Sequence, residues 1–123
     1  PFNIVAVLDW EMATLGDPLM DLGNSMAYWI QADDAPGLLN LRKQPSNAEG
    51  MLTRDEMVEY YAERTGAEIG DFDFYLVYGA FRLAVILQQI YYRFYHGQTK
   101  DERFAVMIQS VRELEKRCLE IIG

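Results

Sequence analysis

Cysteine and histidine are almost absent from this sequence. Its 123 residues include one cysteine, Cys118, which excludes an internal disulfide and a metal cluster held by several thiolates. Because nothing points to an oxidising compartment, we expect a cytoplasmic protein. The one histidine, His96, has no serine or cysteine at a useful spacing, so we expect neither a nucleophilic triad nor a zinc site.

Positive charge is scarce as well. The sequence has 11 Lys and Arg against 19 Asp and Glu, which gives a net charge of −8 at pH 7 and a pI near 4.5. Proteins bind nucleic acids and anionic lipids largely through Lys and Arg that neutralise phosphates. The composition therefore predicts no nucleic-acid partner and no membrane partner.

Long apolar runs free of polar residues are missing too. The most apolar stretch, residues 74–90, contains Arg82, Gln88 and Gln89, and no basic leader with a cleavage site stands near the start. We therefore expect neither a membrane span nor a signal peptide. The sequence starts at Pro1 rather than at a methionine, from which we expect that upstream residues have been lost.

Apolar residues make up half of the sequence, which is enough for a single domain over residues 1–123 to bury a core. Hydrophobic spacing predicts a mainly α chain, with helices over residues 18–31, 54–65, 71 or 73–95, and 99–121. The third should be a buried central helix, because it is apolar nearly all round between residues 74 and 87. Residues 33–50 predict a long loop with a helical turn at 38–41.

Capping residues support the starts of these helices. Asp17 can accept hydrogen bonds from the first free N–H groups of a helix, and Pro18 suits its first position. Thr53 and Thr99 each stand three residues before a glutamate, which is the pattern of a capping box. Asp71 or Asp73 can start the remaining helix, so each of the four predicted helices has a residue that suits its beginning.

The N-terminal residues 4–8 form a β-branched run, which predicts a short buried strand ending at Asp9. A lone strand is unstable in water, because its N–H and C=O groups need a partner. Either the chain pairs through this strand with a second copy, or its partner strands lay upstream. The expected fold is thus a short strand followed by a helical bundle.

Two segments carry a specific resemblance. Residues 7–11 (VLDWE) followed by residues 16–23 (GDPLMDLG) resemble the metal-binding segment of the aminoglycoside phosphotransferase-like kinases. The similarity continues through residues 60–66, 81–88, 91–93 and 97–98, so it covers nearly the whole chain. These later segments are most similar to the branch linked to acyl-CoA dehydrogenases.

The resemblance implies that the chain is the C-terminal portion of a protein-kinase-like large lobe. Asp9 would then hold Mg²⁺ against the phosphates of ATP, a role that suits a carboxylate and a hard cation. Asp21 matches an aspartate that braces the catalytic loop from behind, with a partly exposed helix carboxylate as the alternative. Glu11 is expected to face solvent, with contact to a second metal ion as the alternative.

Arg82 and Gln88 interrupt the apolar central helix. A buried arginine needs a carboxylate partner, so we expect Arg82 to pair with Asp21, Asp33 or Asp34. The alternative for Arg82, and equally for Gln88, is a place on the substrate side of the lobe. The sequence indicates no particular residue for nucleotide binding.

The family's catalytic loop, of the form H-G-D-x-x-x-x-N, does not occur in this sequence. The chain is therefore expected to hold no catalytic residue and to be inactive alone, because positioning and charge stabilisation supply nearly all catalysis of phosphoryl transfer. The expected function is a part in ATP-dependent phosphorylation of a hydroxyl group on a small molecule. An aminoglycoside-like or a hydroxyacyl-CoA-like substrate would fit the family.

Two other readings stay open at the level of sequence. The helices could form a binding module that holds a partner with its acidic surface and with the loop of residues 33–50. Alternatively, the chain could be a structural homodimer that pairs through the strand of residues 4–8, which would hide the edges of that strand.

Overall fold

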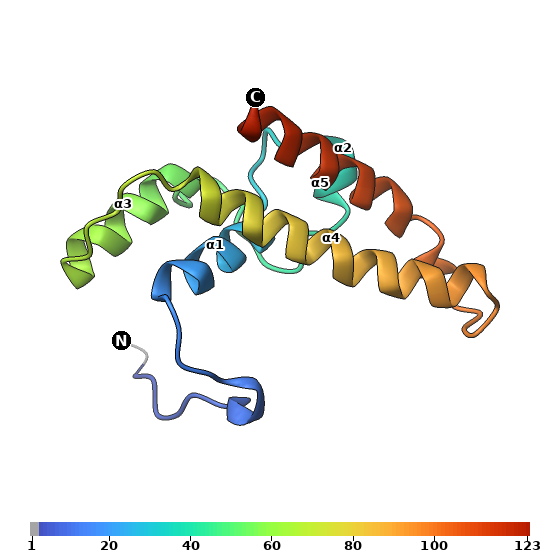
Figure 1. Ribbon diagram of the computed structural model, residues 1–123, viewed down its shortest axis with the longest axis horizontal. Coiled ribbons are helices and arrows are strands. Elements are labelled where there is room, and N and C mark those ends of the chain that lie inside the picture. The colour runs from blue at the N-terminus through green and yellow to red at the C-terminus, as the bar shows by residue number, and fades with distance from the viewer. Residues whose placement is uncertain (1–2) are drawn as a thin grey trace.

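The computed structural model describes residues 3–123, and within them the chain is helical. Five α-helices and two short 3₁₀ helices follow one another in this described part: η1 (Trp10–Met12), α1 (Pro18–Tyr28), α2 (Pro36–Leu39), α3 (Arg54–Thr65), α4 (Asp73–Tyr95), η2 (Glu102–Phe104) and α5 (Met107–Ile122). The longest of them, α4, runs through the middle of the molecule in Figure 1, and α3 lies beyond its N-terminal end.

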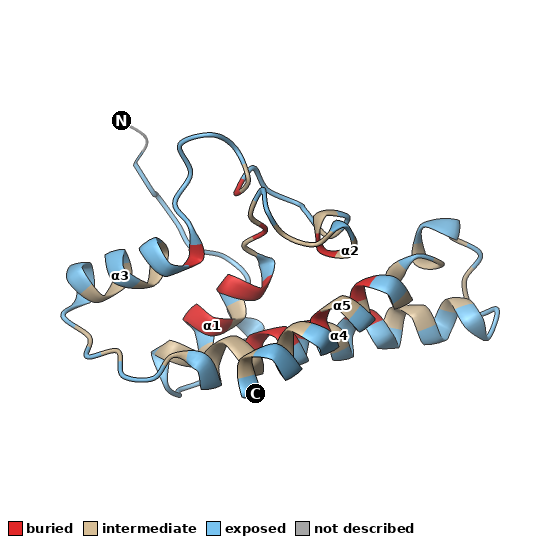
Figure 2. Cartoon of the chain, turned by 90° about the horizontal axis from the view of Figure 1, so that it is seen from above, coloured by how far each residue is buried: buried red, intermediate tan, exposed pale blue. Residues whose placement is uncertain are grey.

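Helix α4 organises the fold because two other helices pack against it. Helix α1 crosses its N-terminal half, α5 lies beside it, and α2 packs on α5. Figure 2 shows the buried positions on the sides where these helices face one another, whereas α3 is mostly exposed. The core cluster consists of small and branched apolar side chains: Ala27, Ile30, Leu38, Ala80, Leu83, Leu87 and Leu114.

Two glycines allow the backbones of α1 and α4 to touch. A Cβ atom at Gly23 would lie 2.3 Å from the carbonyl oxygen of Tyr75, and one at Gly79 would lie 2.2 Å from the carbonyl oxygen of Gly23. Both distances are far inside van der Waals contact, so any larger residue would force the helices apart. The crossing point therefore requires glycine on both helices.

The predicted N-terminal strand is wrong for this structure. Residues 4–8 form no regular secondary structure, and the side chains of Ile4, Val5 and Leu8 are each more than four-fifths exposed. No β-strand occurs elsewhere among residues 3–123, so the backbone N–H and C=O groups of residues 4–8 have no strand to pair with. The β-branched composition alone does not make a strand without that partner.

The helix boundaries were predicted closely where a cap determines them. Helices α3 and α4 begin and end as expected, and Thr53 forms its capping box with Glu56. Helix α1 ends three residues earlier than expected, because the chain turns at Trp29 to place Ile30 in the core, where its side chain is fully buried. The predicted turn at residues 38–41 appears two residues earlier, as α2.

The last predicted helix is broken into two pieces. The Asp101 side chain accepts from the Arg103 backbone N–H at 3.0 Å and starts η2, whereas Thr99 forms no capping box with Glu102. Helix α5 then begins only at Met107. The aspartate thus takes over the capping role that the sequence pattern assigned to the threonine.

Helix α4 is only partly buried, which corrects the expectation of a helix enclosed on all sides. Leu83 and Leu87 face the core, but Phe74 and Phe81 are each 63% exposed. By length and composition α4 could cross a membrane, a property that the core helices of soluble proteins share. Its apolar outer face is therefore a surface feature of the described chain.

Candidate functional site

Asp9 lies in the exposed segment that precedes α1. Its backbone is in the left-handed region, with φ 72° and ψ 43°, and it is the one non-glycine residue among residues 3–123 with positive φ. The conformation starts η1, where the Trp10 indole N–H donates to the Val7 carbonyl oxygen at 2.7 Å. Aspartate tolerates this region better than most residues, and such outliers concentrate at functional sites.

The Asp9 carboxylate is chemically suited to a metal ion. Its side chain is exposed and accepts no hydrogen bond from another group in the described chain, so both oxygens are free. No cluster of three or more metal-ligating side chains exists among residues 3–123. One carboxylate nevertheless fits Mg²⁺, which is commonly held by one or two carboxylates together with substrate phosphates and water.

Asp17 joins the N-terminal segment to the helices with both of its carboxylate oxygens. Oδ1 accepts from the Leu19 backbone N–H at 2.9 Å, which is the predicted helix cap, and Oδ2 accepts from the Tyr75 hydroxyl at 2.6 Å. The Tyr75 bond, and then the Leu19 bond, lower the pKa of Asp17, and the same Asp17 bond raises the pKa of Tyr75. Sequence reasoning missed Tyr75, which lies 58 residues away from Asp17.

Asp21 lies on the exposed face of α1. Within the described chain its carboxylate accepts no hydrogen bond, and its backbone oxygen accepts from the Ser25 hydroxyl at 2.9 Å. Gly23, two residues further along the same motif, has the structural role at the α4 crossing. A glycine within a helix lowers helix stability by about 1 kcal/mol relative to alanine. The presence of Gly23 inside the predicted helix was therefore a sequence signal of close packing.

An open apolar groove of about 570 Å³ lies between α4 and α5. The Gln88 side chain is part of its wall, among mainly apolar neighbours that include Phe81, Val85, Ile108, Val111, Cys118 and Leu119. The groove buries the Cys118 thiol partly, which raises its pKa. Of the two residues expected on the substrate side, Gln88 lies in this groove and Arg82 does not.

Arg82 does not form the ion pair expected of it. Its side chain is exposed, and no carboxylate of the described residues lies within ion-pair distance of it. Asp34, one of the three expected partners, pairs instead with Arg54, which is only 8% exposed. The burial of Arg54 could not be predicted from the sequence, because a basic residue in the first turn of a helix is ordinarily on the surface.

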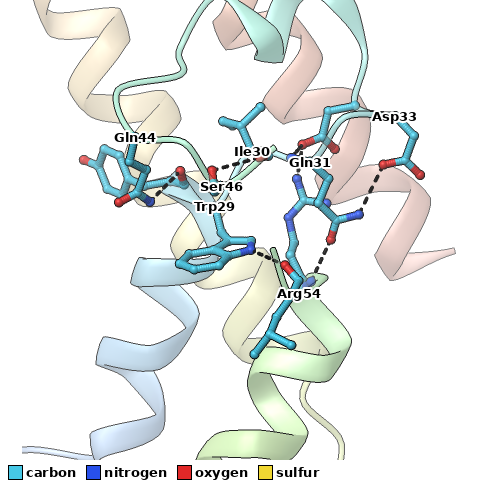
Figure 3. Close-up of polar contacts among 10 residues, drawn as sticks. Trp29, Ile30, Gln31, Asp33, Gln44, Ser46 and Arg54 are labelled. Atoms are coloured by element: carbon cyan, nitrogen blue, oxygen red, sulfur yellow. Dashed lines mark hydrogen bonds and ion pairs between the residues drawn. The ribbon is translucent and has the colours of Figure 1, made fainter. Parts of the chain in front are cut away.

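The Arg54 pair belongs to a polar network that ties the connection between α1 and α3 to the core (Figure 3). The Gln31 side chain accepts from the Arg54 backbone N–H at 2.7 Å, and the Gln31 backbone N–H donates to Asp34 at the same distance. The hydroxyl of Ser46 donates to the Ile30 carbonyl oxygen at 2.9 Å. The long loop predicted for residues 33–50 is therefore fastened at several points.

This network also brings two arginines near one another. Burial, and secondarily the charge of Arg54, lower the pKa of Arg117 on α5. Arg54 and Arg117 line a small polar pocket of about 240 Å³ together with Asp34 and other charged side chains. The pocket contains acidic and basic groups in similar numbers, which is typical of a structural charge cluster.

Comparison with known proteins gives concordant results. The chain is 33% identical to acyl-CoA dehydrogenase family member 10 of Mus musculus over 91% of its own length, and 29% identical to family member 11 of Homo sapiens over 97%. Family member 11 of Gallus gallus is 32% identical over 97% of the chain. No solved structure matches the chain significantly.

These relatives are much longer proteins. The chain spans 11%, 15% and 16% of the lengths of the mouse, human and chicken proteins, respectively. The model of the phosphotransferase enzyme family matches residues 2–63, which is half of the chain and contains Asp9, Asp17 and Asp21. The chain therefore belongs to the phosphotransferase enzyme family, as its Asp9 and Gly16–Gly23 segments indicated.

Proposed function

We propose that this chain is part of an ATP-dependent phosphotransferase that transfers a phosphoryl group to a hydroxyl of a small molecule. The observation that carries the proposal is the family match over residues 2–63, because it includes both the Asp9 segment and the residues 16–23. The exposed Asp9 carboxylate in its left-handed turn supports the same assignment. The family membership is established by this match, whereas the hydroxyl acceptor and ATP as the phosphoryl donor are proposed.

In this proposal Asp9 contributes one carboxylate oxygen to a Mg²⁺ ion. When bound, that ion supplies positive charge next to the nucleotide phosphates. The left-handed backbone turns the chain immediately after Asp9, and the turn is held by the Trp10 and Ala13 hydrogen bonds. The carboxylate thus stands at a fixed bend rather than within a helix, where neighbouring side chains would crowd it.

Asp21 is assigned to supporting the catalytic loop. Its carboxylate lies exposed on α1 and has no partner in the described chain, so it is free to accept hydrogen bonds from backbone N–H groups of another segment. The sequence has no H-G-D-x-x-x-x-N stretch that could supply the base for the acceptor hydroxyl. The chain alone is therefore proposed to be inactive.

Arg82 and Gln88 are assigned to the substrate side. Both project from the exposed part of α4, and Gln88 borders the apolar groove beside α5. The names of the similar proteins favour an acyl-CoA-like acceptor that carries a hydroxyl group over an aminoglycoside-like one. The wall is mainly apolar, with Gln88, Gln89, Arg112 and Glu115 as its polar members. Such a wall suits an acyl chain better than a polycationic sugar.

The test uses the longest protein encoded with this sequence. We expect it to transfer phosphate from ATP in the presence of Mg²⁺ to a hydroxyacyl-CoA, with aminoglycosides as the comparison acceptors. Asp9→Asn removes the negative charge while keeping the size, and we expect activity to fall at least about a hundredfold, as for loss of a strong electrostatic contact. Glu59→Gln, on the exposed side of α3, is the matched control and should keep wild-type activity.

Product formation should be followed by ³¹P NMR, so that phosphorylation of the acceptor is separated from ATP hydrolysis. Full activity of Asp9→Asn would overturn the assignment of Asp9. A wild-type protein that phosphorylates neither acceptor class would contradict the proposed substrates, and one without any ATP turnover would contradict the proposed function.

A further inference from the structure

We propose that Tyr75 is a positioning residue for the metal-binding segment, a role that rests on the proposed function. Tyr75 lies in the first turn of α4, outside residues 2–63 that the family model matches. Its hydroxyl donates to Asp17 at the point where the Asp9 segment enters the helical body. It therefore links a segment that carries the metal ligand to the central helix of the fold.

The segment before Asp17 has few other attachments. Residues 3–11 and 13–17 are exposed, and the hydrogen bonds of residues 7–13 join neighbours within the segment itself. The side-chain bonds of Asp17 to Leu19 and to Tyr75 are the next contacts along the chain. The orientation with which the chain leaves α1 toward Asp9 is thus determined largely at Asp17.

The bond between Tyr75 and Asp17 has the geometry of a strong interaction. Its O–O distance of 2.6 Å is in the range of a hydrogen bond from a hydroxyl to an ionised carboxylate. Because one Asp17 oxygen bonds to α1 and the other to α4, the orientation of the carboxylate group is fixed. The Tyr75 bond also lowers the pKa of Asp17, so the carboxylate stays ionised to a lower pH than an ordinary aspartate.

Tyr75 is itself held in place by its surroundings. The backbone of Tyr75 lies against Gly23, where an added Cβ would meet the Tyr75 carbonyl oxygen at 2.3 Å. The Tyr75 ring packs near two phenylalanine rings, with centroid distances of 5.5 Å to Phe72 and 5.3 Å to Phe74. Close helix packing and aromatic contacts therefore pre-orient the hydroxyl before Asp17 binds it.

The test is Tyr75→Phe, which removes the hydroxyl and keeps the ring. In the longest protein encoded with this sequence, we expect the Mg²⁺ concentration for half-maximal phosphotransfer to rise about threefold to tenfold, in line with loss of a hydrogen bond to a charged group. The melting temperature should stay within about 2 °C of the wild type, because exposed polar contacts contribute little to stability. Tyr78→Phe, one turn further along α4, is the control and should change neither quantity.

Amide hydrogen exchange of the chain itself gives a second readout that needs no activity. Tyr75→Phe should speed exchange at the hydrogen-bonded amides within residues 9–19, which include those of Ala13 and Leu19, and leave residues 80–90 of α4 unchanged. Asp17→Asn should have a similar effect, and the double variant should exchange no faster than the faster single variant, because both changes remove one bond. Wild-type exchange in Tyr75→Phe would overturn the proposal.

These two readouts separate the two possible failures. If the wild type transfers no phosphate but Tyr75→Phe still loosens residues 9–19, the proposed function fails and the tether stands, so Tyr75 has no role in positioning a metal ligand. If phosphotransfer occurs and Tyr75→Phe lowers only the melting temperature, without altering the Mg²⁺ dependence, Tyr75 is a structural residue and the proposal fails.

Discussion

Arg54 and Asp34 form an ion pair in which each side chain is only 10% exposed. Taking two charges out of water is costly, and this cost is offset by the contact between the two side chains and by the Gln31 backbone N–H, which donates to the Asp34 carboxylate. The Arg54 Nε atom is buried and has no partner among residues 3–123, so the network is not fully satisfied. Removing either charge should therefore be more damaging than an exposed pair would suggest.

We predict that Arg54→Leu lowers the free energy of unfolding by about 2–3 kcal/mol, because it leaves Asp34 buried without its counter-ion. The exposed pair of Lys116 and Glu120, at 3.6 Å on α5, provides the control: Lys116→Gln should cost no more than about 0.5 kcal/mol. Urea unfolding at pH 7 measures both. Equal, small effects of the two substitutions would show that the Arg54 pair contributes no more than a surface pair.

At the scale of elements, the junction of α1 and α4 is a close backbone-to-backbone contact. Gly23 and Gly79 bring the two backbones together, and the same approach places Tyr75 beside Asp17. The family-like motif of residues 16–23 therefore has an architectural part in the fold. Asp17 caps α1, Pro18 is its first residue, and Gly23 lets α4 approach.

We predict that Gly23→Ala and Gly79→Ala each destabilise the chain by about 2 kcal/mol or more, because a methyl group would overlap backbone atoms of the other helix. The control is Gly70→Ala, where nothing lies within 4 Å of an added Cβ, and its effect should stay within about 0.5 kcal/mol. Thermal unfolding followed by circular dichroism distinguishes the three. A neutral Gly79→Ala variant would contradict the close crossing.

At the scale of the whole molecule, apolar surface is unevenly distributed. The N-terminal segment exposes Val5 by 95% and Leu8 by 81%, and it extends away from the helices in Figure 1. Exposed apolar patches of this kind commonly mark contact surfaces between proteins. The β-branched residues 4–8 keep the capacity to pair as a strand when a partner strand is present.

We expect the isolated chain to associate as its concentration rises, with strand pairing between the N-terminal segments of two copies. Sedimentation velocity over a wide concentration range should show a growing dimer fraction, and the double substitution Val5→Lys and Val7→Lys should abolish it. Ile122→Lys, at an exposed apolar position of α5, should leave association unchanged. A chain that stays monomeric at every concentration would contradict this expectation.

Local patterns in the sequence were sufficient for most of the helices. The Thr53 and Glu56 capping box, the Asp17 and Pro18 start and the periodicity of residues 73–95 involve contacts within a few residues, so they can be read without knowing the fold. The motifs around Asp9 and Asp21 likewise pointed to the family that the comparison confirms. Asp9 as a metal ligand and Arg82 and Gln88 as substrate-side residues stay predictions.

Other features depended on contacts between distant residues and could only come from the tertiary structure. Residues 4–8 form a strand only if a partner strand is present. Whether Arg54 or Arg82 pairs with Asp34 depends on which of the two arginines lies on the buried side of its helix. Tyr75 reaches Asp17 because two glycines let α1 and α4 touch. The sequence alone determined the local helices and the family, because both depend on patterns of residues within short segments. The tertiary structure decided which polar groups meet, because burial and long-range distance are properties of the folded chain.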